Sequence, residues 1–549
     1  MARCPGPPAP RLRRGCTVVA AAVLTIWISA LPSAQAAIGY RLTFPEREQH
    51  QMQVEVSFTD LPAAPLQLRM SRSSPGRYAL HEFARNVLDV RATDATGRPL
   101  PIAHPNPHEW TVTGHSGEVR VSYSVYGDRV DGTYLAIDSR HAHINMPAAI
   151  VWARGFDDRP ISVRFEPPAG ASWRVATQLF PGRDALTFTA PNLQYLMDSP
   201  TELSAFSLRT FTVPDEGRTP VFRFAAHHAG TDAELDALVR DVEAIVRESR
   251  FVFGEFPAFE GNTYTFIADY VPGNRADAME HRNSTVLTSS APLSGNRIPH
   301  LASVSHEFCH AWNVERIRPA SLEPFNFEDA NTSGELWLGE GFCNYYGSLV
   351  LRRSGLFSVR DYARDISAAV STVLTSPARK VRSVIEMSRL APLVDGAANV
   401  DRSILDGSYI SYYTWGEALG VALDLALRDR SEGRITLDDY MRALWAVFGR
   451  SAARKPGYVE SPYTLADLRR TLADVSGDAA FATQFFADYI EGRDVPDYAR
   501  LLGRAGFLLR AGARGGVEVV PAEDAGQAVT DAQRRFRDAW LSSAARNTF

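Results

Sequence analysis

The chain has 549 residues, of which 45% are hydrophobic and 22% are charged, and its formal net charge is −5. This length predicts about three to four domains, and the composition is ordinary for globular protein. The sequence contains no basic run, which argues against a nucleic-acid partner.

The first 36 residues have the pattern of a signal peptide. Arg11, Arg13 and Arg14 precede an apolar stretch at 17–31, and residues 34–36 read Ala-Gln-Ala, a typical cleavage site. The apolar stretch is shorter than the roughly 20 residues that a membrane span requires. We therefore expect an exported protein, periplasmic or extracellular, with no stable membrane span after cleavage.

Residues 37–220 form short runs of alternating polar and apolar side chains. The runs at 52–58, 118–123 and 161–165 have the period of two that is typical of strands, and turn signals separate them. This pattern predicts an N-terminal antiparallel β domain, and it contains no recognisable catalytic constellation.

From residue 221 the periodicity becomes helical. Residues 232–250 have helical spacing of apolar side chains, and residues 262–269 are a strand candidate. Further predicted helices cover residues 299–313, 335–353, 359–374, 415–430, 437–448 and 465–475. We expect an α+β multidomain chain, in which an α/β domain at 221–375 precedes a helical domain at 376–510. The tail, 511–549, is rich in Ala, Gly and Arg, and we expect it to be partly disordered.

The predicted helix at 299–313 contains an H-E-x-x-H motif, His306-Glu307-Phe308-Cys309-His310. Residues four apart share one helix face, so both imidazoles can bind one ion. Glu307 lies just off that face, where it can polarise a water molecule without binding the metal. The alternative is a pair of buried histidines on an ordinary helix.

The third ligand distinguishes between classes of metallopeptidase. Asn313 and Arg316 stand where a metzincin requires Gly and His, which excludes that class. Two acidic candidates remain: Asp329 in a predicted loop and Glu340 in a predicted helix. We favour Glu340 because a rigid helix fixes a ligand better than a loop does. Glu335 would then be either an outer carboxylate that accepts a histidine N–H or a first-turn acid placed favourably for the helix dipole.

Two further pairs of residues lie on these predicted segments. Tyr412 and Tyr413 precede a predicted helix and offer phenols that could stabilise a developing oxyanion. Cys309 and Cys343 are the cysteines that remain after signal cleavage. An exported chain could oxidise them to a disulfide, but the favoured interpretation is two buried thiols.

Four blocks of sequence carry a family resemblance. Residues 306–319 read H-E-F-C-H-A-W-N-V-E-R-I-R-P, residues 337–342 read W-L-G-E-G-F, residues 280–285 read E-H-R-N-S-T, and residues 74–78 read S-P-G-R-Y. Together they resemble the glycyl aminopeptidase family of zinc metallopeptidases (peptidase family M sixty-one), a gluzincin branch related to aminopeptidase N.

The resemblance implies a fold and several site roles. It implies a thermolysin-like catalytic domain with one zinc ion per chain. Residues 277–281 stand where related aminopeptidases carry G-A-M-E-N, so Met279 and Glu280 are expected to bind the substrate and Glu280 its free α-amine. Tyr413 stands where relatives carry the catalytic phenol.

The chain departs from the family pattern at three points. Asp277 replaces a Gly, and Trp415 replaces a Lys beside the phenol. Many relatives carry a C-terminal PDZ domain, and the residues after Arg510 are too few for one.

From these observations we predict a zinc aminopeptidase that removes small N-terminal residues, Gly or Ala, from peptide substrates. His306, His310 and Glu340 would hold the metal, Glu307 would be the base, and Tyr413 would stabilise the oxyanion. The alternatives are a zinc endopeptidase and an inactive, zinc-stabilised binding protein. The oligomeric state has no sequence signal.

Overall fold

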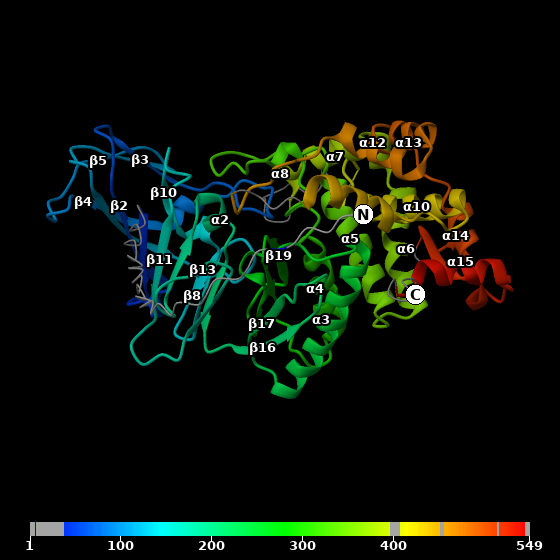
Figure 1. The fold of residues 1–549 in the computed structure, drawn as a ribbon, viewed down its shortest axis with the longest axis horizontal. Helices are drawn as coiled ribbons and strands as arrows, with labels where there is room; N and C mark the ends of the chain where they lie inside the picture. Colours follow the sequence, from blue (N-terminus) through cyan, green and yellow to red (C-terminus); the bar gives the residue numbers. More distant parts are fainter. Residues whose placement is uncertain (1–5, 7–37, 396–406, 451–454, 513–514, 544–549) are drawn as a thin grey trace. The chain divides into compact units, whose positions relative to one another are not determined.

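The computed structural model describes residues 6, 38–395, 407–450, 455–512 and 515–543 (Figure 1). Apart from residue 6, the predicted signal peptide lies outside the described residues. Within the described ranges, no helix combines the length and apolar character that a membrane crossing requires.

The N-terminal part is built from β-sheets, as predicted. Its strands are β1 (Ile38–Thr43), β2 (Gln51–Phe58), β3 (Leu66–Met70), β4 (Val87–Thr93), β5 (Ile102–Asn106), β6 (Glu109–Val112), β7 (Val119–Tyr126), β8 (Leu135–Ile137), β9 (His141–Ile144), β10 (Val151–Ala153), β11 (Ile161–Glu166), β12 (Arg174–Thr177), β13 (Phe180–Pro181), β14 (Thr187–Ala190) and β15 (Thr201–Ser204). Two short helices, α1 (Met146–Ala149) and α2 (Leu193–Met197), lie among them.

These strands form three sheets. The orders are β13-β14-β11-β1-β2-β7-β4, β10-β3-β6-β5 and β12-β15-β9-β8. Pairing is antiparallel except between β1 and β11, which are parallel. In β2 and β7, every second side chain is buried, which is why period-two alternation identified them.

A five-stranded sheet begins the second part, in the order β16-β17-β18-β20-β19. Its strands are β16 (Ser207–Thr212), β17 (Val221–His228), β18 (Thr263–Tyr270), β19 (Asp277–His281) and β20 (Ser284–Thr288). The helices α3 (Asp232–Phe253), α4 (Arg297–Cys309) and α5 (Leu336–Arg353) lie beside it (Figure 1). A capping box of Thr231 and Glu234 starts α3.

The remaining chain is mostly helical, as predicted. Its elements are α6 (Val359–Thr375), α7 (Val384–Arg389), α8 (Ala391–Val394), α10 (Tyr412–Ser431), α11 (Leu437–Leu444), α12 (Leu465–Ser476), α13 (Ala479–Phe485), α14 (Tyr498–Arg504), β21 (Phe507–Ala511), β22 (Val517–Pro521) and α15 (Asp531–Leu541).

Two expectations about segment ends are corrected. The helix that carries the metal motif ends at Cys309 rather than Asn313. The backbone turns away there, and Asn313 donates hydrogen bonds to the carbonyls of Leu338 and Gly339. The tail also contains more structure than expected, because β22 and α15 fold onto the helices. Trp540 on α15 is fully buried.

Two hydrophobic cores support these parts. One lies within the N-terminal sheets, and the other runs continuously from β17 to α15, across the expected boundary at residue 375. Each core also receives side chains from the other part. Tyr78 belongs to the second core, whereas Phe325 and Phe327 belong to the first. The N-terminal sheets and the helical part are therefore packed against each other through shared residues.

Candidate active site

Three side chains of the type that bind zinc converge between α4 and α5. The Nε2 atoms of His306 and His310 are 3.1 Å apart, and Glu340 Oε2 lies 3.7 Å and 3.2 Å from them, respectively. A tetrahedral ion with bonds of 2.0–2.1 Å requires ligand separations of about 3.3 Å. The residues therefore fit a zinc ion with three protein ligands and an open fourth position.

Buried charge also favours a cation at this point. Glu280, Glu307 and Glu340 are each at most 5% exposed, and all three lie close to the imidazole of His310. Burying several carboxylates together is costly unless positive charge accompanies them. Neutral histidines supply no positive charge to compensate these carboxylates, whereas a divalent metal ion does.

Two of the three ligands, His310 and Glu340, are oriented by a neighbour. His310 Nδ1 donates to the carbonyl oxygen of Asn313 at 3.0 Å, which leaves the Nε2 lone pair facing Glu340. The hydroxyl of Tyr78 donates to Glu340 Oε1 at 2.6 Å. Sequence reasoning missed this role of Tyr78, although Tyr78 lies in the 74–78 block, because nothing local connects it to a residue 262 positions later.

The predicted base and amine-binding residue lie beside the ligands. Atoms of Glu280, Glu307 and His310 come within 4.8 Å of one another. Burial, together with the charge of Glu340, raises the pKa values of both Glu280 and Glu307. Glu280 Oε1 and Glu307 Oε2 have no hydrogen-bond partner within the described part of the chain. Both carboxylates are therefore available to groups that the protein itself does not supply.

Tyr413 lies at the first turn of α10, beside the ligands. Its ring is 6.1 Å from that of His306, whereas Tyr412 packs edge-on against Tyr78 at 6.2 Å. Burial raises the pKa of Tyr413 well above its ordinary value. The phenol therefore stays protonated at neutral pH and can donate a hydrogen bond.

The strand β19 is held in place by loops of the N-terminal part. Asp277 is in regular strand geometry and accepts hydrogen bonds from Arg77 and the backbone N–H of Gly132. Gly76 has a φ of 74°, and a Cβ there would lie 2.8 Å from Glu280 Oε2. The Asp that departs from the family pattern thus joins the two parts. Met279 is fully buried beside Glu280.

The role expected of Glu335 as a partner of a ligand histidine is wrong. Glu335 accepts hydrogen bonds from Ser321, Ser333 and the N–H of Gly334, and in the described structure it bonds neither ligand histidine. Its carboxylate lies at the N-terminal end of α5, where a negative charge interacts favourably with the helix dipole. Asp329 is exposed in a loop and is absent from the ligand group.

Cys309 and Cys343 form a disulfide, so the interpretation as two thiols is wrong. Their Cα atoms are 5.5 Å apart, and the bond joins α4 to α5 next to His310 and three residues after Glu340. Packing of the two ligand helices brings these cysteines together, and sequence spacing alone could not show that.

Similarity to one solved structure supports the fold. A crystal structure of an aminopeptidase N family protein from Idiomarina loihiensis matches with a TM-score of 0.71 and 22% identity, over 86% of this chain and 79% of that one. An M1 zinc metallopeptidase from Deinococcus radiodurans matches with a TM-score of 0.49 and 17% identity, over 84% of this chain and 94% of that one. A search of curated proteins found no match.

Family models match both parts of the molecule. The Peptidase M61 N-terminal domain model matches residues 39–205, and the M61 glycyl aminopeptidase model matches residues 300–419, which contain all three candidate metal ligands. Together the two matches cover more than half of the chain. The chain belongs to the M61 glycyl aminopeptidase family and is a peptidase.

Proposed function

We propose that the protein is an exported, zinc-dependent aminopeptidase that removes small N-terminal residues from peptides. The observation that carries the proposal is a pair of side-chain groups that share His310: His306, His310 and Glu340 in one, and Glu280, Glu307 and His310 in the other. A site that only stabilised the fold through zinc would have no use for two further buried carboxylates without partners.

The residues divide the chemistry between them. When bound, zinc supplies Lewis acidity that polarises the scissile carbonyl and lowers the pKa of water. Glu307 removes the proton of the attacking water and passes it to the leaving amine. Tyr413 donates a hydrogen bond to the oxyanion that develops on the carbonyl.

Glu280 sets the position of cleavage. A free α-amine is charged at neutral pH, and burying it without a partner is costly. The carboxylate of Glu280 offers that partner within reach of the metal ligands, so only the first peptide bond lies at the reactive centre. A small first residue is supported by the family match, whose model is that of the glycyl aminopeptidases.

The localisation rests on the sequence pattern of residues 1–36. The Cys309–Cys343 disulfide supports it, because disulfides persist in oxidising compartments outside the cytosol.

The experiment measures hydrolysis of Gly- and Ala-p-nitroanilide by the purified full chain, with and without a chelator. We expect chelator-sensitive hydrolysis that added zinc restores, and no cleavage of the N-acetylated analogues. Efficient cleavage of N-acetylated peptides would instead indicate an endopeptidase. Absence of any metal-dependent cleavage would leave the zinc-stabilised binding protein as the better description.

A further inference from the structure

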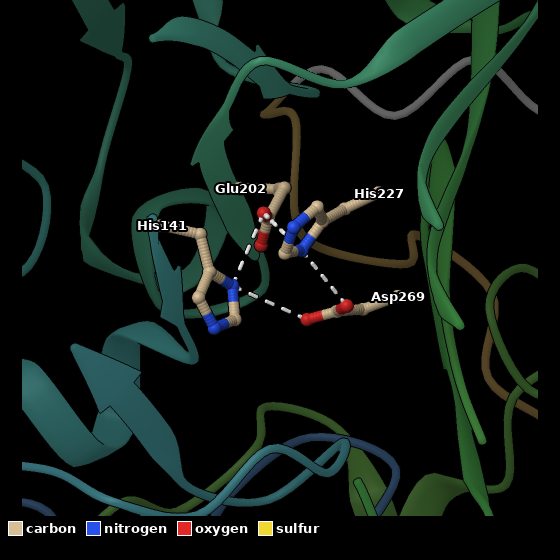
Figure 2. A group of neighbouring side chains, drawn as sticks. All are labelled: His141, Glu202, His227 and Asp269. Carbon is tan, nitrogen blue, oxygen red and sulfur yellow. Dashed lines mark ion pairs between the residues drawn. The ribbon is translucent and has the colours of Figure 1, made fainter. Parts of the chain in front are cut away.

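A second group of side chains of the metal-binding type lies between the two parts of the molecule. Figure 2 shows His141 and Glu202 pointing toward His227 and Asp269. His141 comes from β9 and Glu202 from β15, both in a sheet of the N-terminal part. His227 comes from β17 and Asp269 from β18, neighbouring strands of the five-stranded sheet. Four strands in two sheets thus contribute one side chain each.

The strand register places these side chains on facing surfaces. Glu202 pairs with His143 across the antiparallel ladder, and His141, two residues earlier, shares that face. His227 pairs directly with Asp269 across the parallel ladder. The arrangement is therefore built into the backbone of both sheets, and it does not depend on a flexible loop.

The distances match the ligand separations of a tetrahedral ion. His141 Nδ1 lies 3.4 Å from Glu202 Oε1 and 3.3 Å from Asp269 Oδ2. His227 Nδ1 lies 3.0 Å from Asp269 Oδ1 and 3.9 Å from Glu202 Oε1. These values bracket the separation of about 3.3 Å that bonds of 2.0–2.2 Å to nitrogen and oxygen require.

The four contacts are ion pairs in this structure, yet they lack the geometry of hydrogen bonds. Protonated histidines beside carboxylates would aim their N–H groups at the oxygens. Here the Nδ1 atoms of both histidines, Glu202 Oε1 and both oxygens of Asp269 have no hydrogen-bond partner among the described residues, despite their proximity. Buried polar atoms without partners are uncommon in folded proteins. One possible ligand atom from each of the four side chains lies within 4.8 Å of the others, as the ligand atoms around one metal ion do.

Burial and neighbouring groups support the same interpretation. Glu202 and Asp269 are fully buried, and two carboxylates in that state require nearby positive charge. His143 Nδ1 lies 3.3 Å from Glu202 Oε2, and His143 Nε2 lies 3.0 Å from the carbonyl oxygen of Asp131. His143 therefore orients the Glu202 carboxylate through the oxygen that does not face the cluster. The side chain of His227 is 17% exposed, which provides a path for an ion to enter.

We propose that His141, Glu202, His227 and Asp269 bind a second divalent transition-metal ion, with zinc the preferred one, that joins the N-terminal sheets to the five-stranded sheet. Four protein ligands fill a tetrahedral site and leave no position for a reactive water, so the role is structural. A metal ion that holds these two sheets together would also support the peptidase site, because Tyr78 of the N-terminal part donates a hydrogen bond to Glu340. Two imidazoles with two carboxylates suit zinc better than calcium or magnesium, which take oxygen ligands.

Metal analysis of the full chain, purified with zinc and freed of loosely bound ions, tests the proposal. We expect about two zinc ions per wild-type chain, one in His227→Ala and one in the milder Asp269→Asn. His228→Ala is the matched control, because His228 is the next residue of β17 and lies outside the cluster. It should retain two ions. Both cluster variants should unfold at a lower temperature than wild type yet cleave substrate below that temperature.

A second measurement separates this site from the peptidase site. The variant His306→Ala/His310→Ala should retain one ion, and its cobalt form should show the visible absorption of a tetrahedral centre. Adding His227→Ala should abolish that absorption. No ion in the His306→Ala/His310→Ala variant, or two ions in both cluster variants, would overturn the proposal. None of these counts depends on whether the protein is an aminopeptidase.

Discussion

At the scale of single residues, Glu307 lies close enough to the metal ligands to act on a water molecule while remaining outside the ligand set. It is buried, and its Oε2 has no partner in the described part of the chain. Glu307→Gln preserves the shape of the side chain but cannot accept a proton. We expect full metal content and a loss of kcat of about 10²–10⁴-fold or more, because general-base help is worth that much. Metal analysis and steady-state kinetics check this, and a variant with near wild-type turnover would refute the role.

Glu280 should affect substrates with a free amine far more than it affects the fold. Glu280→Ala should lower kcat/KM for Ala-p-nitroanilide. The loss should correspond to about 2–5 kcal/mol of transition-state stabilisation, as expected for one partner of a buried charge pair. Zinc content should not change. Kinetics on the free and N-acetylated substrates provide the check. If both substrates lose the same small factor, Glu280 is a structural residue and the amine is bound elsewhere.

Tyr78, a residue of the N-terminal part, should increase the zinc affinity of the candidate active site. Its hydroxyl donates to Glu340 Oε1, and loss of such an outer hydrogen bond typically costs 10–100-fold in metal affinity. We therefore expect Tyr78→Phe to release zinc to a competing chelator at 10–100-fold lower chelator concentration. Tyr412→Phe is the control, because the Tyr412 ring packs against Tyr78 but its hydroxyl has no partner among the described residues. Equal zinc affinities in the two variants would contradict this role.

At the scale of elements, local spacing predicted that His306 and His310 lie together. The other residues of the site come together only through packing of separate helices and strands. His306 and His310 are one helical turn apart, so the sequence alone could place them together. Glu340 required a second helix, and the choice between Glu340 and Asp329 depended on recognising that helix. The contact of Tyr78 with Glu340 joins segments that only the folded sheets and helices bring together. The His141 cluster follows no motif, and its sole local signal is the alternation of His141 and His143 on one strand.

The packing of α10 against α6 buries a carboxyl group, Glu417, that makes folding stability depend on pH. Burial raises the pKa of Glu417 on α10 to about 8, and the charge of nearby Asp365 adds to the effect. Between the ordinary pKa of a glutamate and pH 8, the unfolded chain has released this proton while the folded protein retains it. Folding stability contributed by this group therefore falls as pH rises through that window.

The substitution Glu417→Gln removes this dependence. We expect the variant to gain thermal stability relative to wild type at pH 8.5, with a smaller difference at pH 5. Differential scanning fluorimetry across that range measures it. Glu432→Gln, in an exposed side chain at the end of the same helix, should follow wild type at every pH. A Glu417→Gln curve parallel to wild type would show that the carboxyl titrates normally.

At the scale of the whole molecule, the two halves exchange side chains and hydrogen bonds around the candidate active site. Phe325 and Phe327 complete the core of the N-terminal sheets, and the carbonyl of Phe327 accepts hydrogen bonds from Ser71 and Arg72. In the other direction, Arg77 and Tyr78 of the N-terminal part donate hydrogen bonds to Asp277 and Glu340, respectively. The domain boundaries expected from periodicity therefore mark changes of secondary structure, whereas the site itself is assembled across them.

The C-terminal helix α15 is part of this assembly and stabilises the helix that carries Glu340. Trp540 donates from Nε1 to the hydroxyl of Tyr345 at 3.0 Å, and its carbonyl accepts from Arg353. Tyr345 and Arg353 both lie on α5. The spacing of Phe536 and Trp540, four residues apart, is a helical signal within a tail that composition alone indicates to be partly disordered.

Replacing Trp540 should therefore destabilise the molecule without altering its chemistry. Trp540→Ala removes a fully buried indole and should lower the free energy of unfolding by about 3–5 kcal/mol. Below its lowered melting temperature, the variant should keep its kcat, since no ligand or base is touched. Arg535→Ala, at an exposed position of the same helix, should unfold like wild type. Chemical denaturation gives the free energies. An unchanged value for Trp540→Ala would mean that α15 does not pack on α5 in solution, because an indole held in that core cannot be removed at no cost.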